Sequence, residues 1–261
     1  MERLFTLFII AMFVSGNQIK EELLALQANA DFTQAVAGIK TGRFKRDTNR
    51  VTYQYRVTYT RYLRHYMYDP ARLNVIFSDA SLQHLFFRTF GYQGNTRFTI
   101  YPNAWLRDLP LLDIGENVYL GDGILLGTNQ VSENQQFIKV GRISIGKNTI
   151  FDQHCSVGLD TQIGQDVQVR FKSSIGLKCT LGKSITVGEC SIIGHRVQLG
   201  DRVRLGFNTK LGNFVRVDDD VVIGDFQIIP PFSHVTRQGV FSSQPSAHNS
   251  LPNAFAFNTM S

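Results

Sequence analysis

The stretch Ile193-Gly-His-Arg-Val-Gln-Leu-Gly200 contains two copies of a six-residue pattern, an aliphatic residue followed by glycine. From residue 145 to residue 235 a large apolar residue stands at every sixth position, and glycine follows it in eleven of the sixteen cases. A period of six matches neither a helix nor a plain strand, and self-similarity at a fixed period is typical of repeat architectures. The apolar positions are Ile145, Phe151, Val157, Ile163, Val169, Ile175, Leu181, Val187, Ile193, Leu199, Leu205, Leu211, Val217, Ile223, Ile229 and Val235.

Short strands joined by tight turns explain this period, because each strand then places one large aliphatic residue in a common core. The positions four residues later are mostly small or β-branched, and we expect them to point inward as well; they are Thr149, Cys155, Thr161, Val167, Ser173, Cys179, Ser191, Val197, Val203 and Thr209. Three hexads would make one triangular coil, stacked on the next at roughly 4.8 Å. The sequence therefore predicts an all-β solenoid that buries a continuous core.

These hexads resemble those of the hexapeptide-repeat acyltransferases, over roughly residues 111–240. The resemblance implies a left-handed parallel β-helix, a homotrimer, and an acyl-CoA site between neighbouring prisms. The segment Leu109-Pro-Leu-Leu-Asp-Ile-Gly-Glu-Asn-Val-Tyr-Leu-Gly121, followed by Leu126-Gly-Thr-Asn-Gln130, is similar to the hexapeptide modules attached to some non-ribosomal peptide synthetases. The fold also serves other chemistries, so the activity needs its own argument.

A polar insertion interrupts the repeat. Ile114, Leu120 and Leu126 keep the period of six, residues 128–139 (TNQVSENQQFIK) break it, and Val140 restarts it. This pattern predicts a loop thrown out of the prism. In the acyltransferases that the hexads resemble, such a loop carries a catalytic histidine, and in the similar peptide-synthetase modules it commonly begins Thr-His. This loop begins Thr128-Asn129 and contains no histidine.

The spacing suggests a substitute base. If Val140 and the hexads after it occupy the faces in turn, Asn129 and His154 would stack one above the other, about a strand spacing apart. An imidazole suits general-base catalysis because its unperturbed pKa is near neutrality. We therefore predict a catalytic group of His154, Asn129 and Asp152, with Asp152 or Asp160 orienting the imidazole; a solvated corner histidine is the alternative.

Outward basic residues offer partners for a cofactor. Lys172, Lys178 and Arg196 are predicted to meet the phosphates of acetyl-CoA or another acyl-CoA lying along the prism. No metal site is expected: His195 stands where the similar γ-carbonic anhydrases place a zinc ligand, but their pattern needs a second histidine five residues on, where this sequence has Gly200. Cys155 and Cys179 fall at inward positions, and free core thiols favour a reducing compartment.

Composition limits the remaining classes. The chain has 261 residues, 18% charged and 43% hydrophobic, which excludes a disordered chain and a polytopic membrane protein. The net charge of +6 lies wholly within residues 1–110, and residues 40–72 hold nine basic side chains against two acidic ones. That segment predicts contact with anionic lipid headgroups or an acidic carrier protein, and no motif indicates nucleic acid.

Three parts follow from these patterns. Residues 1–110 form a basic, aromatic helical region, with helices expected at 17–40 and 73–91 and a strand-like alternation at 51–60. Residues 111–240 form the β-helix with its loop at 128–139, and residues 241–261 form a tail or arm. The apolar segment 4–14 is too short to span a bilayer, and reads as a signal, a membrane-lying helix or a docked helix in a cytoplasmic protein.

The predicted function is transfer of an acyl group, most plausibly acetyl, from CoA or a carrier thioester to the hydroxyl or amine of a small-molecule acceptor. The alternative is a catalytically silent hexapeptide-repeat scaffold or oligomerisation module, which the missing loop histidine favours.

Overall fold

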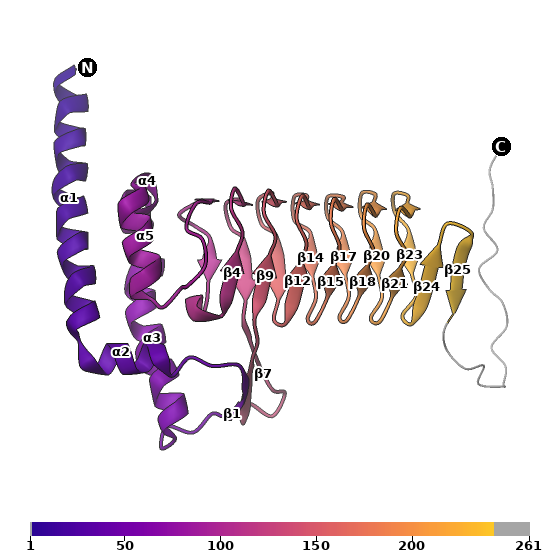
Figure 1. The fold of residues 1–261 in the computed structure, drawn as a ribbon, viewed down its shortest axis with the longest axis horizontal. Helices are drawn as coiled ribbons and strands as arrows, with labels where there is room; N and C mark the ends of the chain where they lie inside the picture. Colours follow the sequence, from indigo (N-terminus) through magenta and orange to yellow (C-terminus); the bar gives the residue numbers. More distant parts are fainter. Residues whose placement is uncertain (1, 243–261) are drawn as a thin grey trace.

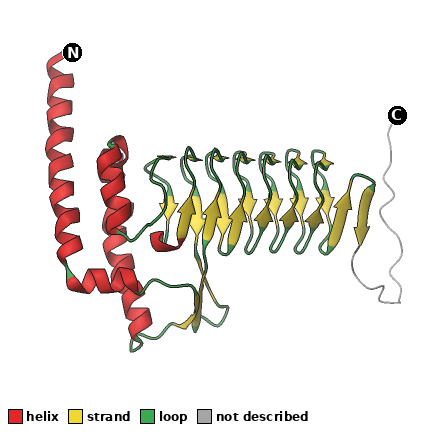
Figure 2. Ribbon diagram, in the orientation of Figure 1, coloured by secondary structure: helices red, strands yellow, loops and turns green. Residues whose placement is uncertain are grey.

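The structure is a computed structural model that describes residues 2–242, with the backbone alone for residues 2–14. Five helices lie at one end of a β-helix, and a terminal hairpin strand closes the other end (Figures 1 and 2). The fold class predicted from the hexads is confirmed. Beyond residue 242, the predicted C-terminal arm lies outside the described residues.

The helical region packs around a cluster of aromatic rings. Its helices are α1 (Glu2–Ala28), α2 (Ala30–Ala37), α3 (Val51–Met67), α4 (Pro70–Ser78) and α5 (Ala80–Thr89). Phe32, Tyr59 and Phe90 are fully buried, and their rings meet edge to face with centroids 5.3 Å and 5.9 Å apart. Such aromatic pairs add stability beyond the area they bury.

The strand-like alternation at residues 51–60 is a wrong prediction, because these residues form the first part of α3. The buried side chains of that helix are Arg56, Tyr59, Leu63, Tyr66 and Met67; the first four are spaced three or four residues apart, and Met67 lies four residues after Leu63. The local strand preference of these β-branched and aromatic residues is thus outweighed by the burial of one face of the helix.

Three parallel sheets form the faces of the prism. Face 1 contains β2 (Thr99–Ile100), β5 (Tyr119–Leu120), β10 (Ile150–Phe151), β13 (Gln168–Val169), β16 (Thr186–Val187), β19 (Arg204–Leu205) and β22 (Val222–Ile223). Face 2 contains β3 (Trp105–Leu106), β6 (Leu125–Gly127), β11 (Ser156–Gly158), β14 (Ser174–Ile175), β17 (Ile192–Ile193), β20 (Lys210–Leu211) and β23 (Ile228–Ile229). Face 3 contains β4 (Leu112–Ile114), β9 (Ile143–Ile145), β12 (Thr161–Ile163), β15 (Thr180–Leu181), β18 (Gln198–Leu199), β21 (Arg216–Val217), β24 (Ser233–Thr236) and the antiparallel β25 (Gly239–Ser242).

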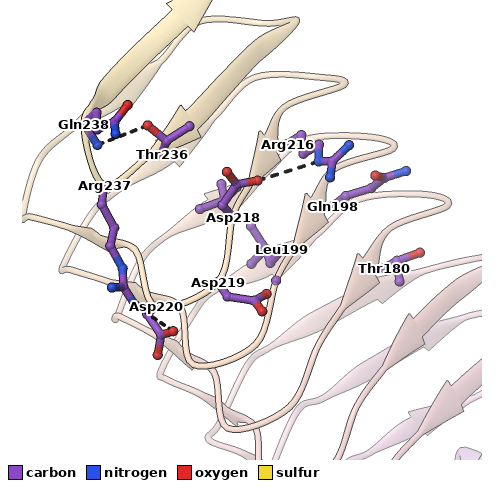
Figure 3. A pocket seen from close by; sticks show the side chains of 12 residues that line it. Thr180, Gln198, Leu199, Arg216, Asp218, Asp219, Asp220, Thr236, Arg237 and Gln238 are labelled. Carbon is purple, nitrogen blue, oxygen red and sulfur yellow. Dashed lines mark hydrogen bonds and ion pairs between the residues drawn. The ribbon is translucent and has the colours of Figure 1, made fainter.

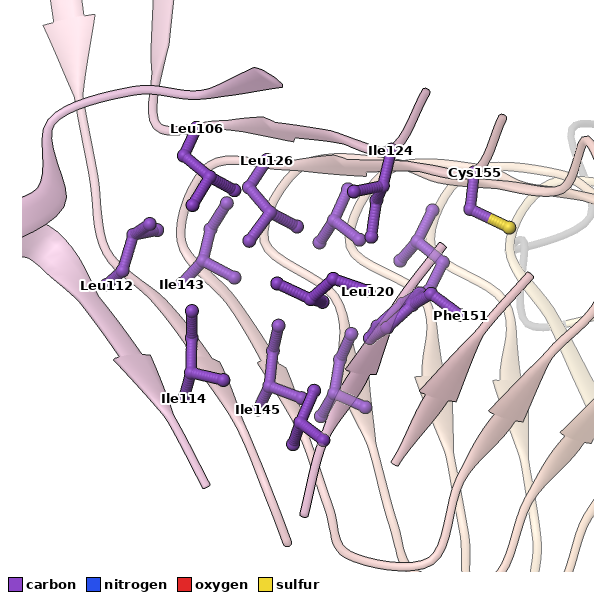
Figure 4. Packing of buried hydrophobic residues seen from close by; sticks show 14 of the residues in the cluster. Leu106, Leu112, Ile114, Leu120, Ile124, Leu126, Ile143, Ile145, Phe151 and Cys155 are labelled. Carbon is purple, nitrogen blue, oxygen red and sulfur yellow. The ribbon is translucent and has the colours of Figure 1, made fainter. Parts of the chain in front are cut away.

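The core of the prism matches the hexad prediction. All sixteen large apolar positions from Ile145 to Val235 are buried, and so are the small positions four residues after them. Figure 4 shows Leu120, Leu126, Ile145 and Phe151 directed into the common interior. The buried hydroxyls also bond between coils: Ser191 Oγ donates to the Gly206 carbonyl at 2.9 Å and accepts from the Thr209 N–H at 3.0 Å.

The corners of the prism share one backbone conformation. Non-glycine residues at every sixth position from Asn148 to Phe232 have φ between 50° and 62°, the left-handed region. We call the corners 1–2, 2–3 and 3–1 after the faces they join. In all three corner columns, N–H groups of left-handed residues donate to carbonyls one coil earlier, as from Lys172 to Gln153 at 3.1 Å. These bonds keep the corners aligned in columns along the prism.

Glycine is required where a corner lies directly under the next coil. A Cβ on Gly188 would lie 2.2 Å from the backbone oxygen of Gly206, whereas a Cβ on Gly224, in the last coil, would have no neighbour within 4 Å. We expect Gly188→Ala to lower the free energy of unfolding by about 1–3 kcal/mol through overpacking. Gly224→Ala is the matched control, expected to be neutral or slightly stabilising. Urea denaturation of both variants measures the difference, and equal stabilities would contradict the stacking constraint.

The β-helix begins earlier than the boundary at residue 111. Its first strands are β2 and β3, which pair in parallel with β5 and β6. Ile100 and Leu106 fill the two inward positions of these strands, but neither is followed by glycine, so the glycine pattern does not reveal this coil. A short 3-10 helix, η1 (Leu109–Leu111), then shifts the spacing before Ile114.

The polar insertion is a hairpin that projects from the prism (Figure 1). Its strands β7 (Asn129–Val131) and β8 (Phe137–Val140) are antiparallel, and β1 (Gly42–Lys45) from the helical region joins the outer side of β8. The guanidinium of Arg43 lies 4.0 Å from the centroid of the Phe137 ring, and Arg46 donates to the Gln135 carbonyl at 3.0 Å. The helical region and the loop are therefore held together.

Candidate functional site

The predicted stacking of Asn129 on His154 is wrong. Leu126 pairs with Val157 rather than with Phe151, so the whole loop lies between a strand of face 2 and a strand of face 3. Asn129 therefore lies at corner 2–3, and His154 lies at corner 1–2. The two residues border opposite edges of the same face 2.

The physical reason is the role of Val140. The period predicts that Val140 is a hexad position of the prism, but Val140 belongs to β8 and pairs with Asn129 across the hairpin. Because Val140 is buried and followed by glycine, its local pattern is the same as that of a prism position. Long-range strand pairing alone separates the two cases.

His154 is an exposed corner residue with φ 60°. Its ring meets the Phe171 ring edge to face with centroids 5.9 Å apart, and Gly123 leaves the space beside it, since a Cβ there would lie 2.4 Å from Nδ1. No hydrogen bond of the imidazole to a described residue is present. A substrate can therefore approach this ring.

The carboxylates predicted to orient His154 have other partners. Asp152 lies 3.6 Å from Arg170 in an ion pair. Asp160 Oδ1 accepts the N–H of Arg142 at 3.2 Å, at the returning end of the loop. Asp160 lies at corner 2–3, like the base of the loop, so it is a loop-supporting residue and is not beside His154.

The predicted cofactor residues divide between the two edges of face 2. Lys178 and Arg196 follow one another along corner 2–3, since Arg196 N–H donates to the Leu177 carbonyl. Lys172 lies at corner 1–2, one coil beyond His154, with its Nζ 5.1 Å from the centroid of the Phe171 ring. The outward residues Ser156 and Ser174 lie between these edges on face 2.

A buried network at the base of the loop was not predicted. Asp108 is 2% exposed, and its Oδ2 accepts from Arg56 Nη2 at 3.0 Å, from Thr128 Oγ1 at 2.7 Å and from Asn129 Nδ2 at 3.3 Å. Burial, and next the charge of Asp108, raise the pKa of Tyr59 well above its ordinary value. The network connects α3, the first coil and the loop, and it orients the amide of Asn129.

Cys155, Cys179 and His195 have structural positions. Burial raises the pKa of Cys155 and that of Cys179 to about 11, which keeps both thiols protonated near neutral pH. His195 Nδ1 accepts the N–H of Leu177 at 3.0 Å, so this imidazole supports a corner. Within residues 15–242, no group of three or more His, Cys, Asp or Glu side chains is arranged for a metal ion.

Several basic side chains of the segment 40–72 contact other residues of this chain. Arg43 and Arg46 hold the loop, Arg56 is buried on Asp108, and Arg72 pairs with Glu22 and Asp69. Of the helices that the structure describes, none has both the length and the apolar character needed to cross a bilayer. Contact with lipid or a carrier protein, like the cytoplasmic location, stays a prediction.

An open groove lies beside β25 on face 3, away from the loop (Figure 3). Its carboxylates are engaged: Asp218 lies 2.8 Å from His234, Asp220 lies 2.7 Å from Arg237, and Asp219 accepts the N–H of Asp201 at 2.8 Å. The groove lies at the C-terminal end of the prism. Because its carboxylates are all bound to other residues, we assign no catalytic group to it.

The chain folds as a left-handed parallel β-helix of hexapeptide repeats, and in this fold it is similar to several solved structures. No family model matches it, and no curated protein matches it.

Three solved structures illustrate the likeness. A mutant of GDP-perosamine N-acetyltransferase from Caulobacter crescentus, in complex with CoA and GDP-perosamine, is 16% identical, with 66% of this chain and 68% of that chain covered and a TM-score of 0.30. The acetyltransferase domain of PglB from Neisseria gonorrhoeae, in complex with acetyl coenzyme A, is 16% identical over 48% of this chain and 57% of that domain, with a TM-score of 0.22. A UDP-N-acetylglucosamine acyltransferase from Francisella novicida is 14% identical over 57% of this chain and 68% of that chain, with a TM-score of 0.24. Nothing about the activity of this chain follows from these values.

Proposed function

We propose that this protein transfers an acyl group, acetyl in the simplest case, from an acyl-CoA thioester to a hydroxyl or amine of a small molecule. The observation that carries the proposal is that all the candidate groups border face 2. His154 and Lys172 border one edge of this face, and the loop, Lys178 and Arg196 border the other. The outward residues between the edges are the small Ser156 and Ser174, followed by the exposed Ile192 in the coil of Arg196.

The charges suit a CoA molecule lying along face 2. Lys178 and Arg196 lie one coil apart on corner 2–3, and Lys172 lies across the face from them. Ammonium and guanidinium groups form strong charge-assisted hydrogen bonds to phosphates. A CoA whose phosphates meet these groups would direct its thioester toward the coil of His154, next to the loop.

The chemistry needs one base. His154 takes the proton of the acceptor hydroxyl or amine as that oxygen or nitrogen attacks the thioester carbonyl. The tetrahedral intermediate then collapses, the carbon–sulfur bond breaks, and the imidazolium returns the proton to the CoA thiolate. An acyl ester or amide and free CoA result, and His154 ends in its starting state.

A second copy of the chain completes the site in this proposal. Within one copy, His154 and the loop lie at opposite edges of face 2, whereas the loop of a neighbouring prism can face His154. We therefore propose a homotrimer in which the Asn129 amide, oriented by Asp108, contacts the acceptor. A non-catalytic scaffold is the second candidate, favoured by the engagement of both Asp152 and Asp160 away from His154.

Calorimetry with acetyl-CoA on the purified oligomer tests the donor site. We expect micromolar binding, weakened about 10-fold or more in Lys178→Gln/Arg196→Gln, because each hydrogen bond to a charged group contributes about 1.5–3 kcal/mol. Lys147→Gln, an exposed lysine before corner 3–1, is the matched control and should bind as the parent does. Absence of binding in the folded oligomer would remove the CoA-dependent proposal and leave the scaffold.

A further inference from the structure

A stack of aromatic and guanidinium groups lies at the helical end of face 2, close to the loop. The ring of Tyr68, just after α3, stacks on Trp105 of β3 with centroids 5.0 Å apart and an angle of 28° between the planes. The guanidinium of Arg64 lies 5.8 Å from the Tyr68 centroid, and that of Arg107 lies 5.3 Å from the Trp105 centroid. Tyr68 is 64% exposed, so solvent reaches this stack.

The stack carries positive charge that the protein does not neutralise. The buried Arg56 is paired with Asp108 at 2.9 Å. Arg64 and Arg107 have no carboxylate partner among residues 15–242, although ion pairs are formed by Arg50, which precedes the same helix, and by Arg72 after it. Two guanidinium groups are therefore available for an external anion.

A small cavity lies among these groups. It has a volume of about 20 Å³ and is lined by Arg56, Arg64, Arg107, Asp108 and Asn129, among others. This space holds one atom of the size of a water oxygen. Arg56 Nη1 is buried and lies 2.9 Å from Asp108 Oδ1 in the ion pair, but its N–H groups are not aligned for a hydrogen bond to any described residue. A buried N–H without an aligned acceptor is costly, and an incoming oxygen would remove that cost.

We infer that this cavity and its rim bind an oxyanion group, a carboxylate or phosphate, of a small molecule. One oxygen enters the cavity against Arg56, and the rest of the group lies at the rim between Arg64 and Arg107. Planar guanidinium groups match both anions in geometry. The biological meaning of this inference rests on the proposed function, in which Asn129 contacts the acceptor of the acyl group. Because Asn129 also lines the cavity, the bound oxyanion group belongs to the acceptor, which therefore carries a negative charge.

Trp105 is the only tryptophan of the sequence, so intrinsic fluorescence reports on this site directly. We would titrate the full chain with inorganic phosphate and, separately, with acetate, at constant ionic strength set by chloride. A saturable change in tryptophan emission at millimolar concentration is expected with at least one anion, and the stronger of the two identifies the group. Arg64→Gln and Arg107→Gln should each weaken the response 10-fold or more.

Arg61→Gln is the matched control, because Arg61 lies on the same helix with its guanidinium 5.5 Å from the Tyr62 ring centroid and does not line the cavity. It should titrate as the parent does. The inference would be overturned if the parent protein showed no saturable response. It would also be overturned if both cavity variants responded as strongly as the parent. The titration contains no CoA, so anion binding without acetyl-CoA binding would reject the proposed function alone, and the opposite result would reject this inference alone.

Discussion

His154→Asn is expected to lower the turnover of acetyl-CoA by about 10²–10⁴-fold, the usual contribution of a positioned general base. The substitution is chosen for the backbone, since His154 has φ 60° and asparagine tolerates this region better than other residues. The imidazole is exposed and packs against the edge of the Phe171 ring and the backbone of Gly123, so its removal should leave the fold intact. Release of free CoA, followed with a thiol reagent in the presence of candidate acceptors, gives the rate.

Ser184→Asn is the control for this variant. Ser184 has the same corner conformation, φ 55°, but lies at corner 3–1, away from face 2. The Ser184→Asn protein should retain the full turnover of acetyl-CoA and should unfold at the same temperature as the parent. A His154→Asn protein with undiminished turnover would show that another group is the base. If the parent binds acetyl-CoA and shows no turnover with any acceptor, face 2 is a binding surface and the scaffold becomes the better proposal.

The prism was predictable because each hexad repeats the same physical demand. One large aliphatic residue fills the interior, one small residue lies beside it, and the next coil leaves no room for a Cβ at the corner, as at Gly188. Each of these requirements is met within a stretch of six residues, so it is visible in the sequence. The first coil escaped prediction because Ile100 and Leu106 meet the first demand without the glycine, so half of the pattern is missing there.

The corner positions of the candidate residues were predictable, and their placement relative to one another was not. Lys178, Arg196 and His154 are outward corner positions, which the period alone defines. Their relation to Asn129 depends on which hexad follows the loop, and Val140 imitates a prism position although it pairs within the hairpin. A count along the chain cannot distinguish the two, because strand pairing across the loop is a long-range property.

The network around Asp108 could not be predicted from the sequence for a similar reason. Its partners Arg56 and Thr128 are 52 and 20 residues away in the sequence, and neither lies in a motif. Two local signals accompany it in the structure, the φ of 27° at Asp108 and the burial of a charged residue on α3. Both become visible only when the helical region is placed against the first coil.

Asp108→Asn is expected to lower the free energy of unfolding by about 3–5 kcal/mol, because removing one partner of a buried ion pair leaves the other charge uncompensated. Asparagine retains the size of the side chain and tolerates the positive φ, so the effect reports the loss of the charge together with one acceptor oxygen. Urea denaturation followed by circular dichroism measures it. Hydrogen exchange at residues 128–140 should also increase, since Thr128 and Asn129 both donate to this carboxylate.

A double-mutant cycle distinguishes this interpretation from a general loss of packing. In Arg56→Met/Asp108→Asn no unpaired charge remains buried, so the double variant should be more stable than Asp108→Asn alone. The exposed pair Arg202–Asp220 is the control, and Asp220→Asn should leave stability nearly unchanged because solvent screens that pair. An Asp108→Asn protein as stable as the parent, with unaltered exchange in the loop, would mean that the β1–β8 pairing holds the loop without the buried ion pair. The helical region would then anchor the loop through one strand, and Asn129 would lack a fixed orientation at the edge of face 2.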